Sequence, residues 1–373
     1  MATTLRNRRW FRILSHFCRI TFAVVFIISG FFKAIDPWGT VMNIDNYQSA
    51  YGINAPEWVV VVFSIWLSCA ELMMGCMLLF KVRIRLVSIF SVLSMSFFTL
   101  LTFLSVTFIP VEDCGCFGEF IKLTPMVTFL KNLVLLPMAI CFWWRYRPDR
   151  IFSFSKLEFG LMVLFFTMSM GLGTYSYLHL PLIDLLPYKE GVNIAEAQQR
   201  ARSRHSGDDV VLVYRNRRTG RLREFALNDK AWHNDKRWEW VETRVDETPD
   251  SHVEPMILEF HISEAQVDKT DSLLALPGRT YMLCAADLSR MSRSCEARMA
   301  ALVERAEQSG DNVICLTPEY FETTHYHSFA DGLPVRCYNI DAKTMKTMLR
   351  ANYGLVELRD GTITSKRNCR DIR

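Results

Sequence analysis

Two cysteines separated by one glycine stand in a short polar stretch of the chain. In 111–120, VEDCGCFGEF, Cys114 and Cys116 flank Gly115, with acidic residues on both sides. Thiols at this spacing can form a disulfide only if the backbone bends, and Gly115 allows that bend. A bond closed under strain is easily reduced, which favours disulfide exchange. Two alternatives stay open, a soft-metal site for Cu(I) or Zn(II) with further ligands from elsewhere, and ordinary loop cysteines. The neighbouring acids disfavour a thiolate and so argue against a strongly activated nucleophile.

The position of this loop follows from five long apolar runs in the first half of the 373-residue chain. They cover residues 13–32, 58–80, 86–109, 126–144 and 157–178. Each is long enough to cross the ~30 Å hydrocarbon layer as a helix. A soluble core that buried all five would be implausibly large for this length, so we predict five membrane spans in contact with the lipid bilayer. The formal net charge of +4 does not indicate a nucleic-acid partner.

Lysine and arginine are distributed unevenly between the loops. The N-terminus, residues 81–85 and residues 145–156 each carry several, whereas 34–57 has none and 110–123 has only Lys122. Basic residues favour the cytoplasmic side. We therefore predict a cytoplasmic N-terminus, with the Cys114–Cys116 loop and the C-terminal domain on the outer side, where disulfides persist.

Two charged residues lie deep inside the first two predicted spans. Arg19 lies in the first span and Glu71 in the second, at similar depths when counted from the cytoplasmic ends. A charge inside the bilayer is costly unless it is paired, so we predict an Arg19–Glu71 ion pair. A structural pin between two helices is the favoured interpretation over a proton relay or a headgroup site. Small residues on the same spans would allow close packing, namely Ser29, Gly30, Ser68, Ala70 and Gly75.

The ordered motifs of the membrane region resemble the DoxX-like family and, within it, the methylamine-utilisation MauE branch. They are Arg19, GFFKAIDPWG (30–39), ELMMGCMLL (71–79), DCGCFG (113–118) and LTPMVTFLKNLVL (123–135). The resemblance implies a four-helix membrane bundle, here with a fifth span added, in a bacterial inner membrane. It also implies a role in maturing a disulfide-rich periplasmic protein. Comparison with vitamin K epoxide reductase-type disulfide formers suggests a quinone, although those enzymes carry CxxC on a helix rather than CxC in a loop.

The chain is predicted to have four parts. These are a membrane bundle (1–145), a fifth span with a linker (146–186), an exported strand-rich segment (187–278) and an exported α/β domain (279–373). After the linker, the segment AEAQQRARSR is predicted to be a helix. In the strand-rich segment we expect strands over 210–214, 222–227, 238–245 and 256–262.

The last part is predicted to alternate between strands and helices. Strands are expected at 279–286, 312–317 and 335–340, helices at 294–310, 319–329 and 342–352, and a hairpin with an Asp-Gly turn at 354–368. This order resembles a thioredoxin-like domain. The segment lacks that family's CxxC pair and the proline before the hairpin, so it resembles a degenerate member.

The exported region carries five cysteines. Cys295 falls near a predicted helix N-terminus, where it is either a reactive thiol or a small residue of a capped helix. Cys284, Cys315 and Cys337 lie in apolar strands and are predicted to be core thiols. An odd number means that at least one cysteine is free or paired elsewhere.

Two functional hypotheses follow. The first is a membrane-anchored thiol–disulfide oxidoreductase that uses Cys114 and Cys116 to assist exported protein clients. The second is a non-catalytic scaffold whose exported domain binds a partner.

Overall fold

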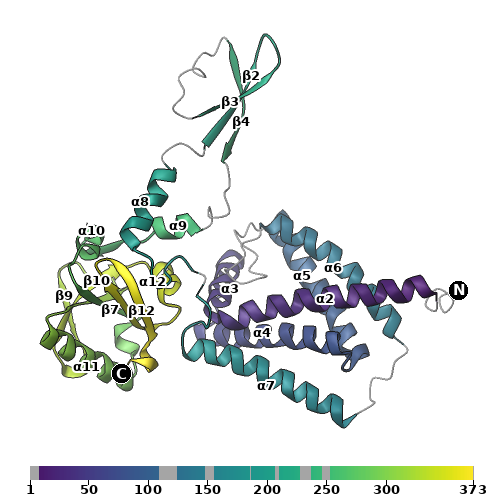
Figure 1. Cartoon of the computed structure of the whole chain (residues 1–373), viewed down its shortest axis with the longest axis horizontal. Coiled ribbons are helices and arrows are strands. Elements are labelled where there is room, and N and C mark those ends of the chain that lie inside the picture. Colours follow the sequence, from purple (N-terminus) through teal and green to yellow (C-terminus); the bar gives the residue numbers. More distant parts are fainter. Residues whose placement is uncertain are drawn as a thin grey trace. The chain divides into compact units, whose positions relative to one another are not determined.

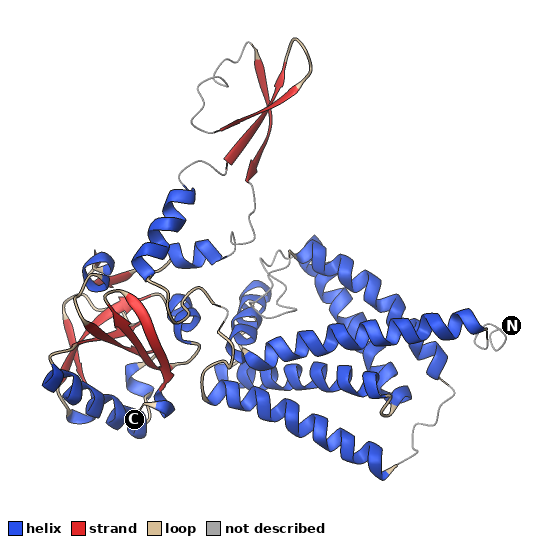
Figure 2. Cartoon of the chain, in the orientation of Figure 1, coloured by secondary structure: helices blue, strands red, loops and turns tan. Residues whose placement is uncertain are grey.

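The computed structural model describes residues 8–108, 124–147, 155–184, 186–205, 210–226, 237–245 and 253–372. Cys114 and Cys116 lie outside these ranges. The chain divides into two compact units, Met1–Asp184 and Leu185–Arg373, which are taken separately below. The first is helical and the second mixes helices with strands (Figures 1 and 2).

The first unit contains five helices long and apolar enough to cross a membrane, which confirms the predicted spans. They are α2 (Arg9–Ile35), α4 (Glu57–Phe80), α5 (Ile84–Thr107), α6 (Pro125–Tyr146) and α7 (Lys156–Leu178). Large apolar side chains are exposed on their outer faces, among them Phe17, Phe63, Trp66, Phe90, Leu133 and Leu164. Such faces suit contact with lipid rather than water.

Helices α2 and α4 pack closely along much of their length. Gly30 lies against the backbone of Leu72, and Gly75 lies against Ala23 and Ile27, with no room for a Cβ atom at either glycine. The core of the unit is completed by apolar side chains from α2, α4 and α6, including Phe22, Phe26, Leu78, Leu135 and Phe142. The predicted role of small residues in this contact is confirmed at Gly30 and Gly75.

An additional helix, α3 (Pro37–Tyr51), occupies the segment that was expected to be a simple outer loop. Its Asp36 N-cap accepts a hydrogen bond from the Gly39 amide at 2.9 Å, and Pro37 fills the first helical position. Gly52 ends it in the left-handed conformation (φ 66°). Trp38 and Val41 pack against the N-terminal half of α4.

The second unit is built on an eight-stranded sheet of the described residues. Its strands are β5 (Ile262–Glu264), β6 (Val267–Asp268), β7 (Arg279–Ala285), β8 (Asn312–Thr317), β9 (His325–Ser328), β10 (Pro334–Ile340), β11 (Tyr353–Arg359) and β12 (Thr362–Asn368). The order is β12-β11-β7-β8-β10-β5-β6, with β9 paired to β10. The central strands β7, β8 and β10 are parallel, and the β11–β12 hairpin joins β7 in antiparallel register.

The helices α11 (Arg293–Ser309) and α12 (Ala342–Leu349) connect consecutive strands of this sheet. The predicted α/β domain is thereby confirmed, as is its hairpin. Asp360 and Gly361, at the turn, both have positive φ angles, 49° and 77°, as a tight hairpin turn with an Asp-Gly pair requires. Strands β5 and β6 extend the sheet to residues before 279, where the domain was expected to begin.

Two predicted elements are wrong. Residues 319–329 were expected to be helical, but His325–Ser328 forms β9, which pairs with β10 at the registers Cys337↔His325 and Pro334↔Ser328. Residues 256–262 were expected to be a strand, but α9 covers Val253–Leu258 and β5 begins only at Ile262. Ile257 and Phe260 are both buried, and their three-residue spacing is that of a helical turn rather than a strand.

The segment before the sheet contains α8 (Ile194–His205) and a separate three-stranded antiparallel sheet. Its strands are β2 (Val210–Asn216), β3 (Leu222–Ala226) and β4 (Trp238–Val245), in the order β3-β2-β4. A small cluster of Leu212, Tyr214, Phe225 and Trp238 is its core. The predicted helix and these three strands are confirmed.

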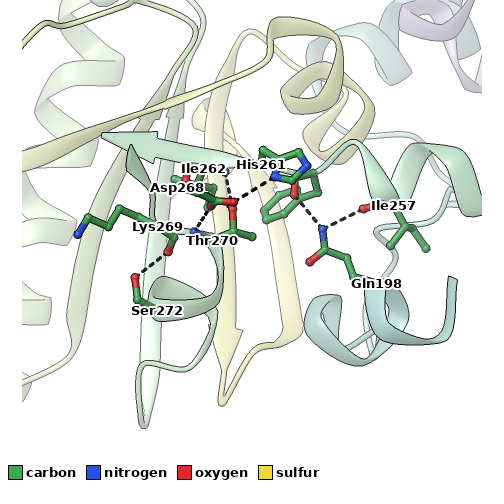
Figure 3. Close-up of polar contacts among 9 residues, drawn as sticks. Gln198, Ile257, His261, Ile262, Asp268, Lys269, Thr270 and Ser272 are labelled. Carbon is green, nitrogen blue, oxygen red and sulfur yellow. Dashed lines mark hydrogen bonds and ion pairs between the residues drawn. The ribbon is translucent and has the colours of Figure 1, made fainter. Parts of the chain in front are cut away.

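Side-chain to backbone hydrogen bonds link α8 to the segment that enters the large sheet (Figure 3). The buried Gln198 amide donates to the carbonyls of Ile257 and Phe260, at 3.2 and 2.8 Å. Thr270, in α10 (Thr270–Leu274), accepts a hydrogen bond from the Ile262 amide at 2.8 Å. These contacts satisfy backbone groups where the chain changes from helix to strand.

Candidate functional site

A buried ion pair links α2 and α4 inside the membrane unit. Lys33 Nζ lies 2.6 Å from Glu71 Oε1, and Ser29 Oγ donates to Glu71 Oε2 at 2.8 Å. Lys33 and Glu71 are each only 4% exposed. Ser29 and Lys33 are four residues apart and therefore share one face of α2. Both carboxylate oxygens are thus hydrogen-bonded, which offsets part of the cost of removing the charges from water.

The predicted Arg19–Glu71 pair is therefore wrong. Arg19 donates from its guanidinium to the carbonyl oxygens of Leu78 and Leu79, at 3.0 Å for the latter. These carbonyls belong to the last turn of α4, where the helix offers few following amides; the Lys81 amide also donates to the Leu78 carbonyl, at 3.4 Å. A cation there also interacts favourably with the negative end of the helix dipole. Arg19 still pins α2 to α4, through a helix end rather than a carboxylate.

The ion pair lines a cavity of about 600 Å³ enclosed by α2, α3, α4, α5 and α6. One face of α3 contributes six lining residues at helical spacing, namely Thr40, Asn43, Ile44, Tyr47, Gln48 and Tyr51. Opposite walls are mainly apolar and include Phe26, Phe63, Phe98, Leu101 and Leu135. A largely apolar pocket with a few polar groups is typical of a small-molecule site.

Two hydroxyl groups of α3 have no hydrogen-bond partner among the described residues. Thr40 Oγ1 and Tyr51 Oη are both buried atoms, and Thr40 as a whole is 3% exposed. On the facing wall, Asn132 donates to Thr102 Oγ1 at 3.3 Å and is satisfied. Lys131, beside it, also lines the cavity.

The Cys114–Cys116 pair falls outside the described residues, so its geometry contributes nothing here. Its neighbours in sequence are the end of α5 at Thr107 and the start of α6 at Pro125. Thr102 and Lys131, near those two ends, both line the cavity.

Cys295 is not a free thiol. It forms a disulfide with Cys369, with the Cα atoms 5.7 Å apart. Ser292 caps α11 and accepts a hydrogen bond from the Cys295 amide, so the helix begins one residue before the predicted start at 294. The bond joins that start to the 3-10 turn Cys369–Asp371 near the C-terminus. Because Cys295 and Cys369 are 5% and 4% exposed, the reactive-cysteine interpretation is wrong and the role is structural.

The three remaining cysteines of the second unit are buried, as predicted. Burial raises the pKa of the Cys284 thiol to about 12. A hydrogen bond to Cys337, together with burial, raises the pKa of Cys315, and the same bond lowers the pKa of Cys337. Thiols enclosed in this way are core side chains rather than nucleophiles. In the described part of the chain, no group of three or more His, Cys, Asp or Glu residues is arranged to hold a metal ion.

Sequence reasoning missed Lys33 as the partner of Glu71 and the whole of α3. The Asp36-Pro37 pair is a helix-start signal that could have located α3. The partner of Glu71 could not be found from the sequence, because it depends on how far α2 is shifted along α4.

Residues 11–145 match the family model described as "Methylamine utilisation protein MauE". The membrane region of this chain is therefore similar to the MauE family. The match covers α2 to α6 almost completely and includes the Cys114–Cys116 loop, whereas α7 and the second unit lie outside it. No curated protein and no solved structure matches the chain. A MauE-type membrane region with a fifth span and an α/β domain is consistent with a membrane-anchored accessory protein.

Proposed function

We propose that this MauE-type protein is a membrane-anchored thiol–disulfide redox protein that assists the maturation of exported clients. Cys114 and Cys116 are its exchanging pair. The α/β domain recognises or presents the client in the same compartment, the periplasm of a bacterial cell, with the N-terminus in the cytoplasm.

The observation that carries this proposal is the Cys295–Cys369 disulfide, taken together with the five spans. With five spans, the loop between the third and fourth spans lies on the same side of the bilayer as everything after the fifth. A disulfide persists in an oxidising compartment. The bond in the C-terminal unit therefore supports an oxidising environment for Cys114 and Cys116 too, in agreement with the distribution of basic residues.

The exchange itself is balanced between two dithiol–disulfide couples. A client thiolate attacks one sulfur of the Cys114–Cys116 disulfide, which gives a mixed disulfide and a free thiol on this protein. The second client thiol then displaces the mixed bond. The client gains a disulfide, this protein gains two thiols, and the two electrons and two protons pass between them. The reverse direction reduces or isomerises a client bond.

A scaffold role is the second candidate, and one observation favours it. In the α/β domain, the helix start where a thioredoxin-like protein would carry its redox pair holds Cys295, which is bonded to Cys369 and buried. The domain therefore has no exposed dithiol among its described residues and suits binding rather than exchange.

Trapping the thiols with a mass-tagged maleimide separates these candidates. Membranes quenched in acid should contain both oxidised and reduced forms of the Cys114–Cys116 pair, and the ratio should change when exported dithiol substrates accumulate. The double variant Cys114→Ser/Cys116→Ser should lose client maturation. Cys76→Ser, which changes a free cysteine inside α4, is the matched control. If the pair never changes its redox state and the double variant still matures clients normally, only the scaffold role remains.

A further inference from the structure

We propose that the arginine-rich β2–β3 hairpin of the second unit docks on the anionic phospholipid headgroups of a membrane. The residues that carry this proposal lie at the turn of the hairpin and at the adjacent start of β4 (Figure 1). The inference depends neither on the thiol chemistry proposed above nor on the side of the bilayer that the domain occupies.

The hairpin concentrates positive charge. Residues 210–226 contain one acidic residue, Glu224, and five arginines, which are Arg215, Arg217, Arg218, Arg221 and Arg223. The resulting formal charge of +4 equals that of the whole chain, so the acidic and basic residues outside the hairpin balance. All five arginines are exposed. Charges gathered in this way create a local positive potential that attracts an anionic surface.

The arginines of the turn have no acidic partner in the described part of the chain. Arg217, Arg218 and Arg221 take part in none of the ion pairs between described residues. Like charges gathered on one turn repel one another, so the cluster does not stabilise the hairpin by itself. An external anionic surface would replace that repulsion with attraction.

Hydrogen bonds fix the turn that carries these side chains. Asn216 Oδ1 accepts from the Arg218 amide at 2.9 Å, and the Asn216 amide donates to the Arg221 carbonyl at 2.9 Å. The Arg217 amide donates to the Arg237 carbonyl at 3.0 Å, which brings a sixth exposed arginine to the same end of the sheet. The basic surface is therefore formed before any partner binds, so docking requires little ordering of the backbone.

Exposed apolar side chains accompany the arginines. Leu222, the first residue of β3, is 58% exposed, and Trp240 of β4 is 59% exposed. The pairing of Trp238 with Asn216 places the start of β4 beside the turn, and Trp240 follows two residues later. Arginine together with exposed tryptophan and leucine is typical of segments that bind in the headgroup region of a membrane.

A lipid surface suits this hairpin better than an acidic protein partner. The five apolar helices hold the chain at a bilayer, and the hairpin begins at Val210, after α7 ends at Leu178. This tether makes docking an intramolecular step with a high effective concentration of lipid headgroups. Each basic residue near an anionic leaflet shifts the binding equilibrium by about fivefold. A cluster of this size is therefore enough to favour the docked state.

The test uses the full-length protein in lipid nanodiscs, with an environment-sensitive dye on Thr219→Cys in the turn and a nitroxide-labelled phosphatidylcholine as the contact quencher. The wild type, carried through the same labelling, gives the background from the native cysteines. Discs of equal parts phosphatidylcholine and phosphatidylglycerol should quench the dye several-fold more than discs of phosphatidylcholine alone. Raising the NaCl concentration from about 0.05 M to about 0.5 M should remove this difference, because salt screens the attraction.

The triple variant Arg217→Gln/Arg218→Gln/Arg221→Gln, in the same labelled chain, should lower the ratio of docked to free hairpin by about tenfold or more. The matched control is Arg290→Gln/Arg293→Gln/Arg359→Gln, which removes three exposed arginines elsewhere in the second unit and changes the net charge equally. This control should dock like the parent chain.

The salt titration needs no further variant, so the proposal stays testable if the triple variant folds poorly. The proposal is overturned if the two kinds of disc quench the dye equally, or if high salt leaves their difference unchanged. It is also overturned if the hairpin variant and the control variant dock equally well. An acidic protein would then be the remaining occupant of the basic surface.

Discussion

The Lys33–Glu71 pair is the most consequential residue-level feature of the membrane unit. A buried ion pair contributes little net stability by itself, because desolvation offsets the attraction between the charges. Removing one partner is different, since it leaves an uncompensated charge among apolar helices. The pair therefore fixes the position of α2 relative to α4 and places an ammonium group at the cavity.

Substituting Glu71 alone should be far more damaging than substituting the pair. Glu71→Leu should lower the free energy of unfolding by about 3–5 kcal/mol, whereas Lys33→Met/Glu71→Leu should recover most of that loss. Urea or SDS titration in mixed micelles measures both. Glu57→Gln, at the start of α4, controls for the loss of an acidic residue. Equal losses in the single and double variants would show that the ion pair does not act as a unit.

A second residue-level contact should make the α/β domain sensitive to acid. Arg336 donates to both oxygens of Glu264, at 2.6 and 2.7 Å, and this hydrogen bonding lowers the pKa of Glu264. The folded pKa is below the unfolded value of about 4.3, so the stabilisation is fully present above that value. It is lost as pH falls through the folded pKa. Solvent around Arg336 limits it to about 1 kcal/mol.

This prediction can be checked by calorimetry of the full chain between pH 6 and pH 3. The transition of the C-terminal unit should fall more steeply below pH 5 in the wild type than in Glu264→Gln, which has no carboxylate to titrate. If the transition temperatures of the wild type and Glu264→Gln fall in parallel with pH, Glu264 has the same pKa in the folded and unfolded states.

At this scale, the sequence identified the charged residues but not their partners. Arg19 and Glu71 were recognised because charges inside apolar runs are rare. The predicted pairing was wrong because the depth of each residue was counted from the end of its own apolar run, on the assumption that the two runs end at the same height in the bilayer. In the structure, Gly30 lies beside Leu72, and this register brings Lys33 to Glu71. Helix register depends on packing, which one helix's sequence does not encode.

At the scale of elements, glycine sets the distance between α2 and α4. A Cβ atom at Gly30 would overlap the backbone of Leu72, which cannot move aside as a flexible side chain would. We therefore expect Gly30→Ala to destabilise the membrane unit by about 1–3 kcal/mol. Gly171→Ala on α7 is the control, because its added methyl group would meet nothing within 4 Å. The same unfolding titration measures the stability of both variants. Equal stabilities of Gly30→Ala and Gly171→Ala would contradict the close packing of α2 and α4 at Gly30.

The disulfide is the second element-level constraint, and it closes a loop between residues 74 positions apart. Chain entropy predicts about 4 kcal/mol of stabilisation for a loop of this length. Cys295→Ala, Cys369→Ala and the double variant should lose similar amounts, since each lacks the whole bond. Calorimetry of the C-terminal unit measures this loss, and treating the wild type with a reductant should reproduce it. Unchanged stability on reduction would contradict the bond.

Elements with local signals were predicted well. The Asp-Gly turn defined the β11–β12 hairpin, and Gly310 marked the end of α11, whose observed N-cap, Ser292, lies two residues before the predicted start at 294. Strand β9 was missed because it exists only through pairing with β10, a contact between segments whose own sequences do not specify it. The helix α3 carried a readable start at Asp36-Pro37 but lay in a segment treated as a loop.

At the scale of the whole molecule, the number of spans matters more than any single contact. Apolar run length alone predicted all five, because the bilayer imposes one length on every spanning helix. The proposed function needs five spans, because that number would put the Cys114–Cys116 loop and the α/β domain on one side. The cavity could not be predicted, since its walls come from five helices that meet only in the folded bundle.

The most direct test of the proposed function is to label cysteines in intact spheroplasts with a membrane-impermeant maleimide after mild reduction. One site is the native Cys114–Cys116 pair. A second is Tyr320→Cys, at an exposed position of the α/β domain, and a third is Lys81→Cys, between α4 and α5. The account predicts that the first two sites are labelled in intact spheroplasts and the third only after the membrane is permeabilised. If the Cys114–Cys116 pair behaves like Lys81→Cys, it faces the cytoplasm and cannot exchange disulfides with exported proteins.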